Sequence, residues 1–398
     1  MQLVRQLSFI DIYLTSLGYI IGAGIYILIG KTAKFADKQT WMAFLIAGIL
    51  ALLNTISYTE LSHLYKKNGG EYDFISSTLG EIPGAFATLI LLLMSILTTT
   101  TVAMGMGEFF KNNFNMSTTK SAAFLILMFG IINMISVRFT TNINKITATV
   151  ETLALILIVI LGWNKVNIKE TIKFPSSLTK VGYATMIAMF AYIGFETTIK
   201  LTEEAINPDR DIPLALTAAL ITSIILYVAV SMVATNVLSR DKITSSATPI
   251  AVTAGKLLMP SAFNVYNLIT FFAISGTILT SILGSSRMLY GVSEYYSYLS
   301  PLRYVNEDTK TPVLSILVVT LLSILALIIN SVEQAAVFTS YLFFIILILV
   351  NISLIYLHYK DDTKEKLNEL WSSSLNKHFP VTPVTSIVTS IIALLSNF

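Results

Sequence analysis

Long apolar stretches separated by short polar connections dominate the sequence. Each is close to the roughly 20 residues that an α-helix needs to cross a bilayer, where lipid requires every backbone group to be satisfied internally. The pattern predicts an all-α integral membrane protein with about eleven spanning helices, and it predicts an interfacial helix around Thr248–Met259, which is too polar to span. The eleven stretches lie at about 9–30, 40–63, 82–110, 119–138, 144–163, 179–205, 213–238, 262–296, 312–330, 332–358 and 381–397.

The composition supports this class and excludes others. Of the 398 residues, 54% are hydrophobic and 12% are charged, whereas about a quarter of a typical soluble chain is charged. A formal net charge of +3 is too small to indicate a nucleic-acid partner. The chain has no cysteine, and its three histidines lie far apart without metal-ligand spacing. We therefore expect no metal, no cofactor and no catalytic centre.

The distribution of charge also bears on domains and orientation. No polar segment is long enough to form a separate soluble domain, so residues 1–398 should form a single membrane domain. With the N-terminus in the cytoplasm, a slight majority of the 26 basic residues and every arginine except Arg240 fall on the cytoplasmic side. The sequence thus predicts a multi-pass protein of the cell membrane with a cytoplasmic N-terminus.

The first apolar stretch is interrupted at its centre by Ile21-Gly22-Ala23-Gly24-Ile25-Tyr26. Each glycine weakens a helix by roughly 1 kcal/mol relative to alanine. If the helix unwinds here, its outer half begins with free amides that suit a carboxylate, and its inner half ends in free carbonyls that suit an ammonium group. These ends would hold a zwitterion. The alternative is that the glycines only let a neighbouring helix approach closely.

The sixth apolar stretch repeats this feature. It contains Ala188–Thr197, in which Gly194 lies at mid-span and is followed closely by an acidic residue. The first and sixth stretches occupy matching places in two five-helix halves, which have opposite orientations because five is odd. Interrupted helices at corresponding places point to a transport site at the membrane midplane. The expected arrangement is a 5+5 inverted repeat, with halves at about 9–163 and 179–358 and an extra helix at about 381–397.

Four motifs in order along the chain extend this pattern. They are Gly22-Ala23-Gly24-Ile25-Tyr26, Tyr58-Thr59-Glu60-Leu61 with Gly69–Phe74, Gly194-Phe195-Glu196 continuing through Glu203–Pro213, and Ser286–Tyr290 with Thr311-Pro312-Val313. With them the chain resembles the amino acid–polyamine–organocation superfamily, whose members have the LeuT-like inverted-repeat fold. The resemblance implies a secondary active amino acid transporter, either a proton-coupled symporter or an exchanger, working by alternating access. The alternatives are an amine or polyamine transporter, a transport-inactive amino acid sensor and a membrane-embedded enzyme.

The resemblance also implies a substrate site between the first and sixth helices, around the breaks at Gly22 and Gly194. The substrate carboxylate would bind the amides of three residues, which are Ala23, Gly24 and Ile25. The amino group would bind nearby carbonyls, which are those of Ile20, Ile21, Phe190, Ala191 and Ile193. Aromatic side chains would form gates or pocket walls, and these are Tyr26, Tyr192 and Phe195.

Ionisable residues within the spans are costly and are therefore functional candidates. Glu196 lies beside the second break, where desolvation would let it exchange a proton near neutral pH. Alternatively, Lys200, four residues later, forms a static ion pair with it. Lys200 is not the usual residue of the family at that position.

Glu151 falls where several proton-linked members of the family carry a lysine. It would bind a proton or a cation together with Thr277, Thr280 and Ser281, or else pair with Lys145. A proton rather than sodium is the expected coupling ion.

Three charged residues near the predicted cytoplasmic ends are gate candidates, namely Glu60, Arg210 and Arg287. The remaining expected partners are a small-molecule amino acid and the lipid bilayer, with the protein itself a monomer or a homodimer.

Overall fold

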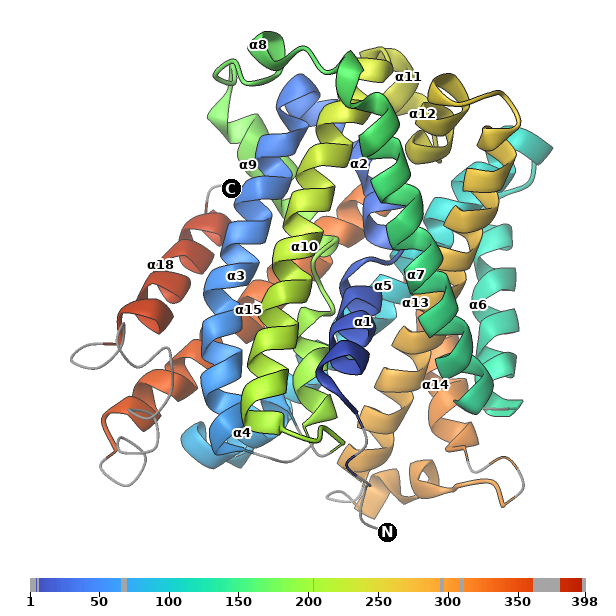
Figure 1. Ribbon diagram of the computed structural model, residues 1–398. Helices are drawn as coiled ribbons and strands as arrows, with labels where there is room; N and C mark the ends of the chain where they lie inside the picture. Colours follow the sequence, from blue (N-terminus) through green and yellow to red (C-terminus); the bar gives the residue numbers. More distant parts are fainter. Residues whose placement is uncertain are drawn as a thin grey trace.

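The computed structural model describes residue 5 and residues 7–395, with gaps at 66–69, 136, 203, 294–296, 308, 310 and 361–379. The described part is built from helices (Figure 1), and its only strand-like feature is an isolated β-bridge between Leu7 and Ala205. This confirms the all-α class. The bridge joins the segment before the first helix to the segment after the sixth, through Leu7 N–H to the Glu204 carbonyl at 2.9 Å and Ile206 N–H to the Leu7 carbonyl at 3.0 Å.

The helices follow one another closely along the chain. The α-helices are α1 Phe9–Ile20, α2 Ala23–Ala36, α3 Thr40–Leu64, α4 Glu71–Leu79, α5 Glu81–Phe114, α6 Thr118–Ile135, α7 Val137–Gly162, α8 Ile168–Thr171, α9 Leu178–Phe190, α10 Pro208–Val237, α11 Arg240–Ser245, α12 Pro249–Leu257, α13 Ala262–Ser293, α14 Val313–Leu325, α15 Val332–His358 and α18 Val381–Leu395. Short 3₁₀ helices lie between them, namely η1 Asp37–Gln39, η2 Trp163–Lys165, η3 Phe195–Leu201, η4 Ser297–Arg303 and η5 Ala326–Ile329.

The expected spans are present in the described residues. Eight apolar segments are long enough to cross a membrane, and one of them, Phe9–Leu64, contains two of the expected spans because it includes α1, α2 and α3. Two shorter apolar segments, Val313–Ile329 and Val381–Leu395, account for the ninth and eleventh expected spans. Helix α12, predicted as interfacial, has nine residues and is too short to cross.

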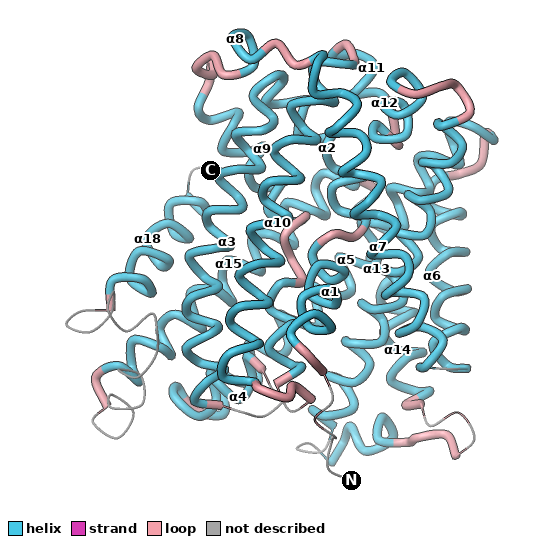
Figure 2. The backbone as a smooth tube through the Cα atoms, in the orientation of Figure 1, coloured by secondary structure: helices cyan, strands magenta, loops and turns pink. Residues whose placement is uncertain are grey.

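The spanning helices form one bundle, and the two halves of the first span lie inside it (Figure 1). Helix α1 packs against α10 and α7, and α2 packs against α9. The short helices α8, α11 and α12 lie at the end of the bundle opposite the N-terminus (Figure 1). Two loop segments are visible at the middle of the bundle, with helix above and below them (Figure 2). These are the two interruptions that the sequence predicts.

The first interruption is short. Helix α1 ends at Ile20, and α2 begins at Ala23 after Ile21 and Gly22. The amide of Ile21 still reaches the Leu17 carbonyl at 2.6 Å, but the amide of Gly22 turns to the Ile20 carbonyl at 3.1 Å. The helical hydrogen-bond ladder is therefore broken at the residues expected to break it.

The second interruption is longer and differs from the prediction in one respect. Helix α9 ends at Phe190, residues 191–194 form a turn, and the chain continues as the 3₁₀ helix Phe195–Leu201. The sequence predicts a span reaching residue 205, whereas no α-helix follows the break here. Gly194 has φ of +123° and separates the turn from the 3₁₀ helix, and the β-bridge to Leu7 follows at Ala205.

Candidate functional site

The two interruptions face each other across the centre of the bundle. A Cβ atom added to Gly24, in the first turn of α2, would lie 2.7 Å from the Cα of Ala191 in the second break. A Cβ atom added to Gly194 would collide with the carbonyl oxygen of Tyr19, near the end of α1. Only glycine leaves room for backbone to meet backbone at these two positions. The structure thus brings together the predicted substrate-binding segments, Ile20–Tyr26 and Phe190–Phe195.

The second half of the first span, α2, presents its amides to this junction. In the first turn of an α-helix the amides have no partner inside the helix. The amide of Ala23 donates to Oγ1 of Thr277 in α13 at 3.2 Å, and those of Gly24 and Ile25 follow it in the same turn. These amides lie at the positive end of the α2 dipole. The arrangement suits a carboxylate.

Of the three residues predicted on α13, Thr277 reaches the first break. Besides accepting from Ala23, its Oγ1 lies 2.7 Å from where a Cβ atom on Gly22 would be. The Thr280 hydroxyl instead donates to the carbonyl of Gly276 in its own helix at 2.8 Å. The carbonyl of Ser281 accepts from Ser95 Oγ at 3.3 Å. These contacts of Thr280 and Ser281 are thus made away from the break.

Tyr227 in α10 is a functional candidate that the sequence analysis missed. Its hydroxyl donates to the carbonyl of Ile20 at 2.8 Å and to that of Ala191 at 3.1 Å, so one phenol reaches both breaks. The side chain is fully buried. A tyrosine deep within a spanning helix needs an acceptor for its hydroxyl. From the sequence, this requirement predicts that the Tyr227 hydroxyl has a hydrogen-bond acceptor, but it does not identify the acceptor.

The three predicted wall residues are fully buried, and each is held by a neighbouring helix. The Tyr26 hydroxyl donates to the backbone carbonyl of Glu151 in α7 at 2.9 Å, and the Tyr192 hydroxyl donates to that of Phe44 in α3 at 2.9 Å. The ring of Phe195 makes edge contacts with two further aromatic rings. These side chains enclose the junction of the breaks with apolar surface.

Glu196 caps the break that precedes it. Its Oε2 accepts from the backbone amide of Gly194 at 2.8 Å, and the residue is 7% exposed. The carboxylate therefore satisfies an amide that the turn frees. The predicted ion pair with Lys200 remains a prediction, because the Lys200 side chain lies outside the described residues.

Glu151 lies beside the first break, since its carbonyl accepts from Tyr26. It is 3% exposed, and within the described part of the chain its carboxyl group has no hydrogen bond or ion pair. The alternative partner Lys145 has its side chain outside the described residues. A buried carboxyl group without a partner is expensive in its ionised form.

The predicted gate residues lie at the end of the bundle that carries the N-terminus. Glu60 is buried in α3, whereas Arg210 and Arg287 are exposed. At this end the end of α3 meets the start of α10, where His63 Nδ1 lies 3.1 Å from Asp209 Oδ1. The network of Glu60, Arg210 and Arg287 stays a prediction.

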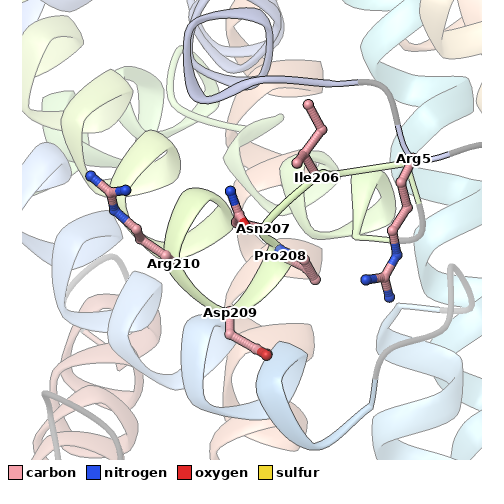
Figure 3. Close-up of a pocket in the computed structure, with 6 residues that line it drawn as sticks. All are labelled: Arg5, Ile206, Asn207, Pro208, Asp209 and Arg210. Atoms are coloured by element: carbon pink, nitrogen blue, oxygen red, sulfur yellow. The ribbon is translucent and has the colours of Figure 1, made fainter.

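A cavity of about 450 Å³ opens at the same end. In Figure 3, Arg5 and Arg210 lie on opposite sides of Asn207 and Pro208, and Asp209 lies between them. The two guanidinium groups therefore do not converge on one position. The lining residues are Arg5, Ile206, Asn207, Pro208, Asp209 and Arg210.

At the other end, two lysines of α2 form ion pairs that the sequence analysis also missed. Lys31 lies 2.8 Å from Glu108 in α5, and Lys34 lies 3.1 Å from Glu333 in α15. The other carboxylate oxygen of Glu333 accepts from the Tyr183 hydroxyl at 3.3 Å. The spacing of the lysines puts them on one helical face. Their partners are distant in sequence, so no local pattern identifies them.

A bundle of spanning helices with two facing interruptions is an architecture found among secondary transporters with broken helices. The model of the amino acid permease family matches residues 7–398, and the chain belongs to this family. The family and the relatives described next are permeases and transporters rather than enzymes.

The chain is similar to curated proteins that are named for different substrates. It is 25% identical to the vacuolar cationic amino acid transporter 4 of Arabidopsis thaliana, over 81% of this chain and 58% of the relative. It is 24% identical to two proteins of Bacillus subtilis, the methylthioribose transporter and the branched-chain amino acid permease BcaP, over 78% of this chain and 72% and 71% of the relatives. The chain spans less than two thirds of the plant transporter's length.

Proposed function

We propose that this protein is a secondary active amino acid transporter working by alternating access. The observation that carries the proposal is the meeting of two interrupted helices at Gly24 and Ala191, with family membership as its context. Unsatisfied backbone groups are tolerated at membrane depth only where protein or a cavity surrounds them. Two such breaks in contact are therefore expected to serve a ligand at the midplane.

The proposed binding mode follows from the direction of the freed groups. The amides of Gly24 and Ile25 bind the substrate carboxylate, as the positive end of a helix favours an anion. The carbonyls at the end of α1 and in the second break bind the amino group. Tyr26, Tyr192 and Phe195 enclose the substrate and exclude water.

The proposed transport cycle uses a 5+5 inverted repeat, with halves at about 9–163 and 179–358. The protein is proposed to lie in the cell membrane with its N-terminus in the cytoplasm. It works as a proton-coupled symporter or an exchanger, with Glu151 and Glu196 as the candidate proton carriers. Glu151 is the stronger of the two on geometry, because Glu196 already accepts from Gly194.

The proposed cargo class is an α-amino acid. A site that grips the head group by backbone atoms accepts different side chains, which agrees with relatives named for cationic and for branched-chain amino acids. The amine alternative would leave the α2 amides without an anionic partner. One relative is named for methylthioribose, so the binding experiment below includes this compound, which lacks the amino and carboxylate groups of an amino acid.

Thermal-shift measurements on the purified protein with leucine, arginine, methylthioribose and putrescine test the cargo class. Flux of the stabilising compound into liposomes, with and without a proton gradient, tests transport. We expect an amino acid to stabilise the protein and to be transported. Stabilisation by putrescine or methylthioribose alone would contradict the cargo class. Binding of an amino acid without flux would indicate a sensor.

A further inference from the structure

The hydroxyl of Tyr227 occupies a special position between the two breaks. It donates to the carbonyl of the last residue of α1 and to a carbonyl inside the second break, at 2.8 and 3.1 Å. These carbonyls belong to Ile20 and Ala191, two of the groups proposed to bind the cargo's amino group. A phenol has one hydrogen, so the two carbonyls share it as a three-centre bond.

The ring of Tyr227 is held in place by its neighbours. Its centroid lies 5.1 Å from that of Tyr192 and 5.8 Å from that of Phe44, with all three side chains buried. Tyr192 belongs to the second break, and its own hydroxyl is bound to the Phe44 carbonyl. The phenol is thus directed at the breaks by packing from both α3 and the break itself.

The Tyr227 hydroxyl resembles the cargo's ammonium group in what it offers these carbonyls. Both are donors to the carbonyls at the two breaks. The Ile20 carbonyl also accepts from the Gly22 amide at 3.1 Å, whereas the Ala191 carbonyl accepts from the Tyr227 hydroxyl. A buried carbonyl without a donor is costly in a low-dielectric interior. Because Tyr227 belongs to the protein, its hydroxyl is available to these carbonyls whether or not cargo is present.

We infer that Tyr227 takes the place of the cargo's amino group at the two breaks and thereby lets the unloaded carrier close and change sides. This inference rests on the proposed transport function. Net uptake requires the carrier to return unloaded, whereas exchange requires only loaded carriers. Tyr227 is therefore a positioning residue for the unloaded half of the cycle.

The test compares Tyr227→Phe with the matched variant Tyr266→Phe in liposomes. The Tyr266 hydroxyl also donates to a buried backbone carbonyl, that of Ala154 at 2.9 Å, but this carbonyl lies inside the continuous helix α7. Net uptake into empty liposomes and exchange with preloaded liposomes are measured for the same amino acid. Tyr227→Phe should lower net uptake about tenfold and exchange less than about twofold. This is the effect expected when the buried Ala191 carbonyl loses the Tyr227 donor, while the Ile20 carbonyl keeps the Gly22 amide. Tyr266→Phe should change the ratio of the two rates little.

Equal loss of both rates in Tyr227→Phe, loss of neither, or the same change of ratio in Tyr266→Phe would overturn the inference. If Tyr227→Phe does not fold, Tyr227→Gln and Tyr227→Met replace it, since glutamine donates hydrogen bonds and methionine does not. Net uptake relative to exchange should then be higher for glutamine, and equal ratios would overturn the inference. Absence of any amino acid flux in the unaltered protein would instead contradict the proposed function.

Discussion

The two interruptions meet at the same place but are made differently. The first spans two residues and is followed at once by the regular 14-residue helix α2. The second spans four residues and is followed by a 3₁₀ helix of seven residues. The first break is thus a short gap between two α-helices. The second is a turn that is followed by a 3₁₀ helix, and no α-helix begins again before α10.

The breaks also differ in how their freed groups are satisfied. At the second break the amide of Gly194 is taken by Glu196, two residues further along the chain. At the first break the amide of Ala23 depends on Thr277, a residue of another helix, and Gly24 and Ile25 follow without a side-chain cap of their own. The first break therefore offers the amides of α2 as well as the carbonyls at the end of α1, whereas the second, with a carboxylate beside it, offers mainly carbonyls. This asymmetry would fix the orientation of a zwitterion.

The largest effect is expected from filling the space where the breaks touch. Gly24→Val should strongly weaken amino acid binding, because its Cβ alone would lie 2.7 Å from the Cα of Ala191. Overpacking costs roughly 1–3 kcal/mol, which would weaken binding about tenfold or more. The matched control is Gly284→Val in α13, where an added Cβ meets nothing within 4 Å. Binding is measured by titration of the purified variants, and unchanged affinity in Gly24→Val would remove the backbone site.

A smaller effect is expected at the glycine of the second break. Gly194→Ala should lower the thermal stability by about 1–3 kcal/mol, because alanine is strained at positive φ and its Cβ would collide with the Tyr19 carbonyl. Gly80 also has positive φ, +102°, but open space around it. Gly80→Ala therefore reports the strain alone, and the difference between the two variants reports the contact between the breaks. Equal losses in thermal unfolding would show that this contact contributes nothing.

The sequence predicted these two breaks because their causes are local. A pair of glycines inside an apolar stretch weakens the helix at the position of the glycines. The sixth stretch also has a mid-span glycine, and this predicts the second break. The 3₁₀ geometry after Gly194 was not predictable in the same way. It depends on the turn at residues 191–194 and on the pairing of Ala205 with Leu7, which is almost 200 positions away in the chain.

The residues that the sequence analysis missed depend instead on contacts with residues distant in the chain. Tyr227 is ordinary within its own helix, and its importance comes from two carbonyls that lie 207 and 36 positions away. The partners of Lys31 and Lys34 lie 77 and 299 positions away. Such contacts are fixed by how the helices pack, so no periodicity or motif in one segment reveals them.

Two substitutions of Glu196 distinguish its role as a cap of the second break from a role as a proton carrier. Glutamine keeps an oxygen that can accept from Gly194, so Glu196→Gln should retain thermal stability and flatten the pH dependence of uptake. Glu196→Ala removes the acceptor and should lose about 1 kcal/mol of stability. Thermal unfolding and uptake across a pH series measure the two roles independently. If the pH profile persists in Glu196→Gln, the carboxylate is only a cap, and Glu151→Gln becomes the variant to test.

The smallest effect concerns the ion pair that holds α2, the helix that follows the first break. Lys31 and Glu108 have side chains that are 20% and 28% exposed, so their ion pair is only partly screened by solvent. A double-mutant cycle with Lys31→Met and Glu108→Gln should give a coupling of about 0.5–1 kcal/mol in thermal unfolding. Added salt should reduce this coupling.

The pair Lys173–Glu170 is the control for that cycle, because its side chains are 62% and 45% exposed and it lies outside the bundle. It should give a smaller coupling than Lys31–Glu108. If α2 must move to open the first break, the pair Lys31–Glu108 also has to separate, and neutralising it should speed exchange as well as lower stability. A variant that loses stability without any change in exchange rate would show that α2 stays attached to α5 throughout the cycle, and that opening occurs at the second break.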